Sequence, residues 1–440
     1  MTLPPPRAAY VHIPFCLRRC FYCDFPVVPL GDKADGSSSP SIASYLELLH
    51  HDIATSAGGP PLSTVYFGGG TPSLLTADQV EGVLAALQAR YGLADGAEIT
   101  LEMDPATFDE ARLQAVIRCG INRVSLGGQS FDDTVLQGLG RHHRRHHLLE
   151  AAGWLHEARQ QGRLRSWSLD LIQGIPPLLE APSSPSLTDW RSHWLLQLEQ
   201  SIQLRPPHLS VYDLSIEPGT VFARRLELGQ LEMPEPDWAA DLMDLTASRL
   251  REAGYGRYEI SNYALPGHAS RHNRVYWSGA GWWGFGMGAT EAPFGRRLPR
   301  PRTRQGYALW LAERGPVRGE TPQAFPLDEL VIVGLRRREG INLAQLLAAH
   351  GFSPSDLDTL QARLSPWIER RWLCLEGERW RLSDPEGLAL SNSVLRDFLV
   401  WWLEQPASQP AFAGESTPVE PQPPTDAHPA TAEQTEVGDP

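Results

Sequence analysis

Cysteine is scarce in this chain, which contains five cysteines among 440 residues. An odd number cannot all pair, and Cys119 and Cys374 each stand alone, so a disulfide scaffold is disfavoured. We expect these two side chains to be buried and to behave as small apolar residues. The other three cysteines lie together near the N-terminus, and their segment is the most informative part of the sequence.

Long hydrophobic runs are also missing. No stretch approaches the roughly 20 apolar residues of a membrane-spanning helix. The first ten residues, MTLPPPRAAY, carry prolines where a signal peptide has its apolar core. We therefore expect a cytoplasmic protein without a membrane span, in a reducing compartment that keeps thiols free.

Lys and Arg are absent from residues 405–440, which contain six acidic residues and eight prolines. This segment supplies almost half of the formal net charge of −13. Because it cannot bury enough apolar surface to offset its ordering entropy, we predict a disordered acidic tail. The rest of the chain is mildly acidic and lacks the basic footprint of a nucleic-acid-binding protein.

Cys16, Cys20 and Cys23 have the spacing CxxxCxxC. Three thiolates on one short loop can hold three irons of a cubane cluster, which leaves the fourth iron without a protein ligand. An open iron can bind and activate a small molecule. Glycine-rich and carboxylate-bearing segments elsewhere in the chain would suit the amino acid and ribose of S-adenosylmethionine.

A structural zinc site is the alternative for these thiols, since closely spaced thiolates also bind zinc. Zinc needs a fourth ligand, and the sequence has no later cysteine pair. His12 would have to serve, although it lies upstream on a predicted strand. The cluster is the favoured interpretation.

The first half of the chain alternates apolar, β-branched runs with segments of helical periodicity. The candidate strands read AAYVHIPF, STVYFGG, EITLEMD, NRVSLGG, WSLDLI and HLSVYDL. Six βα units form either an open doubly wound α/β sheet or an incomplete, TIM-like (β/α)6 barrel. The barrel is favoured because the chemical motifs fall at the C-terminal ends of the strands, where barrels gather their reactive groups.

Several polar motifs share that predicted rim with the cysteine loop. Gly69, Gly70 and Thr71 follow the second strand, where free N–H groups could face a carboxylate, although a tight turn is the plain alternative. Glu102 ends the third strand and Asp170 lies within the fifth. Each could accept hydrogen bonds from an ammonium group or from ribose hydroxyls, or could cap a helix.

Other polar residues are given structural roles. Asp104 and Asp109, near Pro105, are interpreted as helix caps. The run from Arg141 to His147 contains adjacent histidines, which point in different directions on a helix. We interpret this run as a solvated helix start and not as a metal or nucleic-acid site.

A set of motifs in this order resembles one known family. They read YVHIPFCLRRCFYCDF, YFGGGTPS, LEMDP, GINRVSLGGQSFDD, LGRHH, DLIQGIP, LSVYDLSIEPGT and YEISNYA. Together they are similar to the radical S-adenosylmethionine (SAM) proteins related to oxygen-independent coproporphyrinogen III oxidase. The resemblance runs from about residue 8 to about residue 400.

This resemblance implies a [4Fe-4S] cluster on the three cysteines, with SAM bound to the open iron and cleaved after one-electron reduction. The remaining residues that it places around SAM are Tyr10, Tyr22, Gly69, Gly70, Thr71, Glu102, Gln129, Arg141 and Asp170. The cofactor supplies the bond chemistry, and the protein supplies orientation and exclusion of water.

Two features favour a heme chaperone branch of this group. The oxidases carry a fourth cysteine two residues after the third, and Phe25 stands there in this chain. The segment RHNRVYWSGAGWWGFGMGA contains the pattern HNxxYW, and the resemblance implies that its His272 binds heme. Tyr276 and the tryptophans beside it could cover the macrocycle. A core histidine inside an aromatic cluster is the alternative.

The expected domains are a radical SAM partial barrel over residues 1–230 and a rim-closing segment with the HNxxYW motif over 231–320. A winged-helix-like domain of helices and one β-hairpin is expected over 321–404, followed by the tail. Such a domain does not by itself imply DNA binding.

The predicted function is that of a heme chaperone that binds a [4Fe-4S] cluster, SAM and heme. Its partners would be a heme-acceptor protein and an electron donor, neither of which the sequence identifies. An oxygen-independent coproporphyrinogen III oxidase is the main alternative, and an iron–sulfur protein without chemistry of its own is a third.

Overall fold

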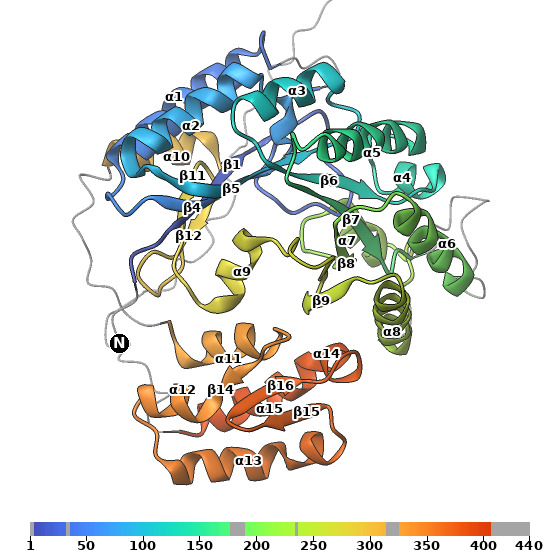
Figure 1. The fold of residues 1–440 in the computed structure, drawn as a ribbon, viewed down its shortest axis with the longest axis vertical. Helices are drawn as coiled ribbons and strands as arrows, with labels where there is room; N and C mark the ends of the chain where they lie inside the picture. The colour runs from blue at the N-terminus through green and yellow to red at the C-terminus, as the bar shows by residue number, and fades with distance from the viewer. Residues whose placement is uncertain (1–3, 32–35, 177–189, 234–235, 314–324, 406–440) are drawn as a thin grey trace, which may run out of the picture.

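A computed structural model of the chain describes residues 4–31, 36–176, 190–233, 236–313 and 325–405 (Figure 1). Six parallel strands lie side by side in chain order. They are β1 (Ala8–Ile13), β4 (Leu62–Gly69), β5 (Leu93–Met103), β6 (Arg123–Gln129), β7 (Ser166–Gln173) and β8 (His208–Asp213). The six predicted βα units are therefore confirmed.

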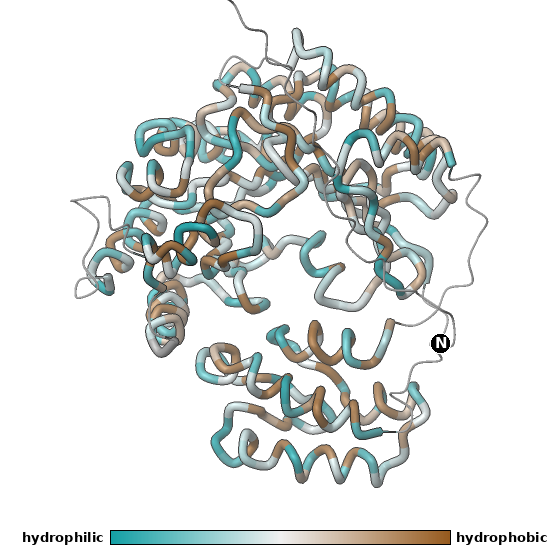
Figure 2. The backbone as a smooth tube through the Cα atoms, turned by 180° about the vertical axis from the view of Figure 1, so that it is seen from behind, coloured by the Kyte–Doolittle hydropathy of each residue, from teal (hydrophilic) through white to brown (hydrophobic). Residues whose placement is uncertain are grey.

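Helices follow these strands, and most of them connect one strand to the next and cover the outside of the sheet (Figure 1). They are η1 (Pro72–Leu74), α1 (Pro40–Thr55), α2 (Ala77–Tyr91), α3 (Glu110–Arg118), α4 (Asp133–Gly138), α5 (Arg145–Gln160), α6 (Trp190–Gln203) and α7 (Val221–Glu227). Figure 2 shows hydrophobic and hydrophilic stretches alternating along the helices, as expected for helices that bury one face.

Three shorter strands extend the sheet at its two edges. β11 (Trp283–Phe285) pairs in parallel with β1, and β10 (Asn262–Ala264) and β9 (Gly256–Glu259) continue antiparallel beyond β8. The sheet order β11-β1-β4-β5-β6-β7-β8-β10-β9 does not close on itself. The fold is the expected incomplete barrel, and β11 is an addition that the sequence did not predict.

Strand alternation makes the concave side of this sheet polar. On β7, the side chains of Trp167, Leu169 and Leu171 are fully buried in the apolar core beneath the helices. The intervening Ser168 and Asp170 hydrogen-bond to each other on the opposite face. Successive strand residues face opposite sides of the sheet. The apolar residues of β7 therefore face the helices, and its polar residues face the barrel interior.

Helix α9 (Arg271–Ser278), which carries the HNxxYW pattern, lies where the strands begin. Near the start of the paired part of β5, the Glu98 carboxylate accepts the backbone N–H groups of Arg271 at 3.1 Å and His272 at 3.0 Å. We expected this motif to close the cofactor rim, and that expectation was wrong. The helix covers the opposite end of the barrel because Glu98 caps its first turn there.

A later part of the same segment does reach the cysteine loop. Arg302 donates to the carbonyl oxygen of Asp24, and its guanidinium lies 3.9 Å from the Asp24 carboxylate. The remaining elements here are α8 (Pro236–Glu252), α10 (Arg304–Glu313), β12 (Thr290–Glu291) and β13 (Leu298–Pro299).

The C-terminal region has an apolar core of its own, which includes Val331, Leu360, Trp380 and Phe398. It contains α11 (Leu327–Leu335), β14 (Ile341–Asn342), α12 (Leu343–Ala349), α13 (Pro354–Glu369), β15 (Leu373–Glu376), β16 (Arg379–Leu382), α14 (Glu386–Ala389) and α15 (Ser391–Leu403). The predicted helices and β-hairpin are present. Of the predicted acidic tail, all but Gln405 lies outside the described residues. None of the helices in the described parts of the chain is long and apolar enough to span a membrane.

Candidate cofactor site

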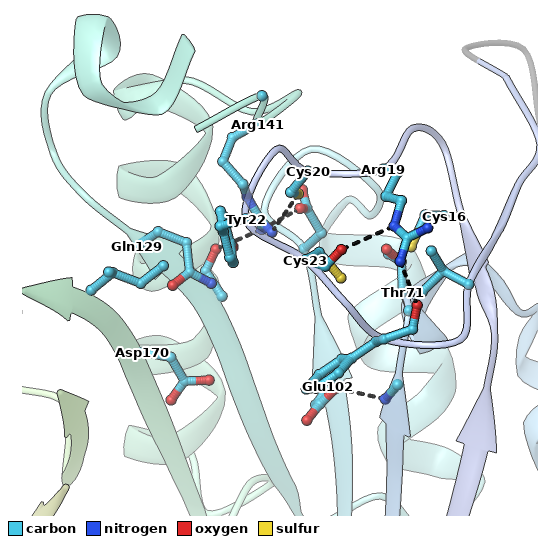
Figure 3. A pocket seen from close by; sticks show the side chains of 18 of the residues that line it. Cys16, Arg19, Cys20, Tyr22, Cys23, Thr71, Glu102, Gln129, Arg141 and Asp170 are labelled. Carbon is cyan, nitrogen blue, oxygen red and sulfur yellow. Dashed lines mark hydrogen bonds and ion pairs between the residues drawn. The ribbon is translucent and has the colours of Figure 1, made fainter. Parts of the chain in front are cut away.

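The three clustered cysteines lie on a loop that is held at both ends by a short parallel ladder. β2 (Phe15–Cys16) pairs with β3 (Val28–Pro29), and the backbone N–H of Cys23 donates to the carbonyl of Cys20 at 3.3 Å. All three thiols are free and half-buried, and they line one cavity of about 490 Å³ (Figure 3). Cys119 and Cys374 are half-buried as well, so their expected burial was overestimated.

This donor set fits an iron–sulfur cluster better than one zinc ion. Within the described ranges, no three His, Cys, Asp or Glu side chains are close enough to hold a single metal ion. Burial raises the pKa of the Cys16 thiol to about 12, so a bound cation is needed to keep it as a thiolate at neutral pH. Three thiols spread around one cavity suit several irons.

His12, the fourth ligand that zinc would require, has partners on both ring nitrogens. Nδ1 lies 3.0 Å from the Tyr10 hydroxyl, and Nε2 lies 3.1 Å from the carbonyl oxygen of Pro26. That carbonyl can only accept, so Nε2 carries the proton and Nδ1 accepts from Tyr10. Burial lowers the pKa of His12 to about 4, which keeps the ring neutral. His12 therefore braces the end of the cysteine loop, and Tyr10 supports it from outside the cavity lining.

The Gly69, Gly70 and Thr71 segment packs directly against the cysteine loop. A Cβ atom at Gly70 would lie 2.8 Å from Cys16 Sγ, so only glycine permits this approach. The N–H groups of Gly70 and Thr71 donate to the carbonyls of Ile13 and Phe15 at 2.8 and 2.7 Å. The N–H of Gly69 is also taken, because it donates to a carboxylate on β5. The expectation that these N–H groups are free for a ligand was wrong.

Glu102 lies deeper in the same cavity, at the end of β5 (Figure 3). Its Oε1 accepts from the Tyr66 hydroxyl at 2.9 Å, and its Oε2 accepts from Gly69 N–H at 3.0 Å. Burial raises the pKa of Glu102 to about 7, although both hydrogen bonds act in the opposite direction. A carboxylate in this state is ready to receive a cationic ligand, which would restore its usual acidity.

Asp170 faces Glu102 across the cavity from β7 (Figure 3). Its oxygens accept from the hydroxyls of Ser125 and Ser168, each at 2.8 Å. Burial raises the pKa of Asp170, and the serine hydroxyls oppose this rise. Two buried carboxylates with neutral supports can accept hydrogen bonds from ammonium or hydroxyl groups, as the sequence analysis expected for SAM.

Gln129 is placed in the cavity by a distortion of β6. Its backbone has a φ angle of 63°, and the pairing of β6 with β7 shifts register between Gly127 and Gln129. Positive φ is rare outside glycine, and such distortions re-aim a side chain near a functional site. A Cβ atom at Gly128 would lie 2.7 Å from Leu169 Cδ1, so the bulge also requires a glycine.

Arg141 reaches the cluster loop from the start of the histidine run. Its Nη1 lies 3.6 Å from Cys20 Sγ, and its Nη2 bonds to Asp104 Oδ2 at 2.6 Å and to the Gly127 carbonyl at 3.1 Å. Burial alone would raise the pKa of Asp104, but the Arg141 guanidinium, together with His143 and the Ala106 N–H, holds this pKa well below its usual range. Asp104 is thus a buried counter-ion, and its interpretation as a helix cap was incomplete.

His143 corrects the interpretation of the histidine run as solvated. Its side chain is fully buried, Nε2 donates to the carbonyl of Gly128 at 3.0 Å, and Nδ1 lies 3.6 Å from Asp104 Oδ1. The run therefore anchors Arg141 and the β6 bulge. The sequence did hold a signal for Asp104, because Glu102 and Asp104 are two residues apart and strand alternation places both on one face.

His272 lies apart from this cavity and has no free ring nitrogen. Its Nδ1 bonds to the Thr64 hydroxyl and its Nε2 to the Tyr276 hydroxyl, both at 2.8 Å, and its side chain is 1% exposed. Burial, with a smaller contribution from Arg123, lowers the pKa of His272 to about 3, so the ring is neutral. Binding of heme iron by His272 stays a prediction, and it requires Nε2 to leave Tyr276.

The cavity brings together most of the residues predicted around the cofactor. It is lined by Cys16, Cys20, Tyr22, Cys23, Gly69, Gly70, Thr71, Glu102, Gln129, Arg141 and Asp170. Tyr10 lies behind this lining and His272 at the other end of the barrel. Tyr66, Asp104 and His143, which the sequence analysis did not assign to the site, hold its charged groups in place.

Comparison with known proteins agrees with this geometry. Residues 10–177 match the model of the radical SAM superfamily. Heme chaperone HemW of Synechocystis sp. is 40% identical over 417 residues, which cover 89% of this chain and 95% of that protein. The chain belongs to the HemW family of radical SAM proteins. Membership of the superfamily implies a [4Fe-4S] cluster and SAM, which supply one-electron reductive chemistry that the side chains of this cavity lack.

Other similar proteins cover the chain just as fully. HemW of Escherichia coli is 33% identical over 402 residues, with 91% of this chain and 100% of that protein covered. Bovine mitochondrial radical S-adenosyl methionine domain-containing protein 1 is 33% identical over 431 residues, with 92% and 90% covered. The solved structure of E. coli coproporphyrinogen III oxidase, HemN, matches with a TM-score of 0.71 at 20% identity, over 90% of each chain. That last likeness shows a shared fold.

Proposed function

We propose that this chain is a heme chaperone: it binds heme and passes it to an acceptor protein. The observation that carries this proposal is the similarity of the whole chain to proteins named heme chaperone HemW, at 40% and 33% identity. The acceptor and an electron donor for the cluster are inferred partners, identified so far only by these roles.

The cofactor cavity supports a second part of the proposal, the binding of an iron–sulfur cluster and SAM. The three cysteines of the loop would hold a [4Fe-4S] cluster, and SAM would bind exchangeably beside it. Glu102 and Asp170 supply buried acceptors for its polar groups, and Arg141 places a positive charge near Cys20. Burial of this charge beside the thiol stabilises an electron-rich cluster.

Phe25 favours the chaperone over a coproporphyrinogen III oxidase. Its side chain lines the cavity and is 54% exposed, at the position where the oxidases were expected to carry a fourth cysteine. A phenyl ring offers neither a metal ligand nor a proton, so this position does not supply the fourth thiol expected of the oxidases. The fold that this chain shares with the oxidase does not by itself imply the oxidase activity.

Helix α9 is the proposed heme-binding element, with His272 as the iron ligand once Tyr276 has released its Nε2. A titration of the anaerobically reconstituted protein with hemin tests the function. We expect a Soret band that saturates at one heme per chain and heme that moves to an apo-acceptor. Heme that binds without saturation and never leaves the protein would contradict the proposal.

A further inference from the structure

Helix α9 has a second functional face, turned away from His272. His272 and Tyr276, four residues apart, point into the barrel, where they bond to each other. On the outer side, Trp277 borders a groove of about 360 Å³. The groove lies between α9, the end of β9 and the residues that follow α11, at the junction of the barrel and the C-terminal domain (Figure 1).

Three arginines line this groove, Arg271, Arg274 and Arg337. Arg271 donates to the Gly96 carbonyl at 2.8 Å, which fixes it at the base of α9. The Arg274 side chain is 50% exposed and pairs with Glu339 at the surface. An exposed pair of this kind is weak, so Arg274 can exchange Glu339 for an incoming carboxylate at little cost.

Arg337 is the least satisfied of the three. Its Nη2 donates to the Gly340 carbonyl at 3.0 Å, but its Nε is buried without a hydrogen-bond partner. An unpaired buried donor costs free energy. Burial also lowers the pKa of Arg337, which reflects the same incomplete solvation. Arg337 is thus only partly satisfied by its protein partners.

The acidic residues of the groove do not cancel these charges. Glu259 is 1% exposed and already accepts from the backbone N–H of Ser261 at 2.9 Å, from Asn262 and from the Trp277 side chain. Glu339 pairs with Arg274, and its charge also acts on Arg337. The three arginines of the groove still outnumber its two carboxylates, so the site favours an anion.

Apolar surface lies beside this charge. Trp277 is half-buried and Val275 precedes it on the same helix, so the groove places apolar side chains beside cations. A planar apolar ligand that carries carboxylates matches both features. Heme is such a ligand, since its porphyrin bears two propionates at one edge.

We propose that this groove binds the propionate edge of heme, with Arg274 and Arg337 as the principal carboxylate partners and Arg271 as a third cation. This inference rests on the proposed heme-chaperone function and adds an alternative binding surface for its one heme, occupied when the iron is not bound to His272. A cavity of about 360 Å³ is at the small end of the usual range for ligand pockets. It takes one edge of the porphyrin and leaves the rest accessible, as transfer to an acceptor requires.

Metal-free protoporphyrin IX isolates the groove from the iron ligand, because it keeps both carboxylates. The experiment titrates the full-length, reconstituted protein with this porphyrin and with its dimethyl ester, following porphyrin fluorescence. The variants are Arg274→Gln, Arg337→Gln and the double change. Arg396→Gln on α15 is the matched control, since its side chain is 71% exposed and lies outside the groove.

We expect each single variant to bind the acid about 3–10-fold more weakly, and the double variant at least 30-fold, as for charge-assisted hydrogen bonds. The ester should bind the unchanged protein about 10-fold more weakly than the acid, and the double variant should not distinguish the two. Glu339→Gln should tighten binding, because it frees Arg274. The control should change binding less than twofold.

Equal binding of acid and ester by the unchanged protein would overturn the inference, as would a double variant with undiminished affinity for the acid. If heme still binds in either case, the proposed function stands and only the groove is wrong. If neither heme nor protoporphyrin binds the unchanged protein, both fail. Thermal unfolding of each variant confirms that the fold is retained.

Discussion

Tyr66 stacks on His272 with ring centroids 5.1 Å apart, and its hydroxyl donates to Glu102 Oε1 at 2.9 Å. One tyrosine therefore touches both the motif helix α9 and the cofactor cavity. Glu102 continues this contact to Gly69 beside the cysteine loop. These side chains join the two ends of the barrel interior, and variants among them can separate the roles of the two ends.

Tyr66→Phe keeps the ring on His272 and removes only the hydroxyl. Glu102 then loses one of its two donors, which costs about 1–3 kcal/mol when the group is buried. We expect SAM to bind about 5–10-fold more weakly, as measured by calorimetry on the reconstituted protein. Heme affinity should stay within twofold. An equal loss of both affinities would show that the hydroxyl also supports α9.

Cys20→Ala should abolish the [4Fe-4S] absorbance and the bound iron, because two thiolates cannot hold a site-differentiated cluster. Cys119→Ala provides the control, since that thiol is half-buried but does not line the cavity. Iron and sulfide analysis of both variants after anaerobic reconstitution makes the comparison. Retention of a full cluster by Cys20→Ala would contradict the ligand set.

Glu102 should make the SAM-free protein less stable as the pH rises. Its pKa is about 7 in the folded protein and 4.5 in the reference state, so the folded form binds this proton more tightly. The raised pKa contributes about 3 kcal/mol of folding stability, which is fully present below pH 4.5 and is lost between pH 4.5 and 7. The unfolding temperature of Glu102→Gln should rise relative to that of the unchanged protein as the pH increases from 4.5 to 8. A constant difference across this range would contradict the assignment.

Asp104→Asn removes the counter-ion of a buried guanidinium. Breaking such a pair from one side costs about 3 kcal/mol or more, because Arg141 is left uncompensated. Asp109→Asn is the control, since Asp109 caps α3 through Arg112 N–H at 2.8 Å and asparagine caps equally well. We expect denaturant unfolding to show a large loss for Asp104→Asn and almost none for Asp109→Asn. Equally small losses of unfolding free energy in the two variants would show that Asp104 acts only as a cap.

His272 and Tyr276 test the predicted iron ligand in opposite directions. His272→Ala should remove the ligand, shift the Soret band and weaken heme binding, with the cluster spectrum unchanged. Tyr276→Phe should free Nε2 of His272 and tighten heme binding by about threefold, the value of one hydrogen bond. Titration with hemin measures both. Weaker heme binding by Tyr276→Phe would show that a residue other than His272 binds the heme iron.

The sequence predicted the fold well because its signals are local. Apolar strands separated by amphipathic helices identified six βα units, and the C-terminal helices and hairpin followed from the same periodicities. β11 escaped prediction because it is short: in GWWGFGMG, glycines surround Trp283 and hide a strand of three residues. It belongs to the sheet only through its pairing with β1, which lies far away in the sequence.

The site residues that belong to a sequence motif could be predicted, whereas the contacts that depend on tertiary packing could not. Residues from Cys16 to Asp170 meet in one cavity because most of them lie near the C-terminal ends of parallel strands or on the loops that follow, and these ends share an edge. The N–H groups of Gly70 and Thr71 were misjudged, since their acceptors on the cysteine loop are set by tertiary contact. The burial of His143 and the inward orientation of His272 likewise depend on distant partners, Gly128 and Thr64.

The central claim is that this chain handles heme rather than making its precursor. The most direct test is anaerobic incubation of the reconstituted protein with dithionite and SAM, together with either coproporphyrinogen III or heme. Protoporphyrinogen formation and the Soret band are followed in parallel. The account predicts a heme complex at one per chain and no decarboxylation. Formation of protoporphyrinogen without a stable heme complex would contradict it and identify an oxidase.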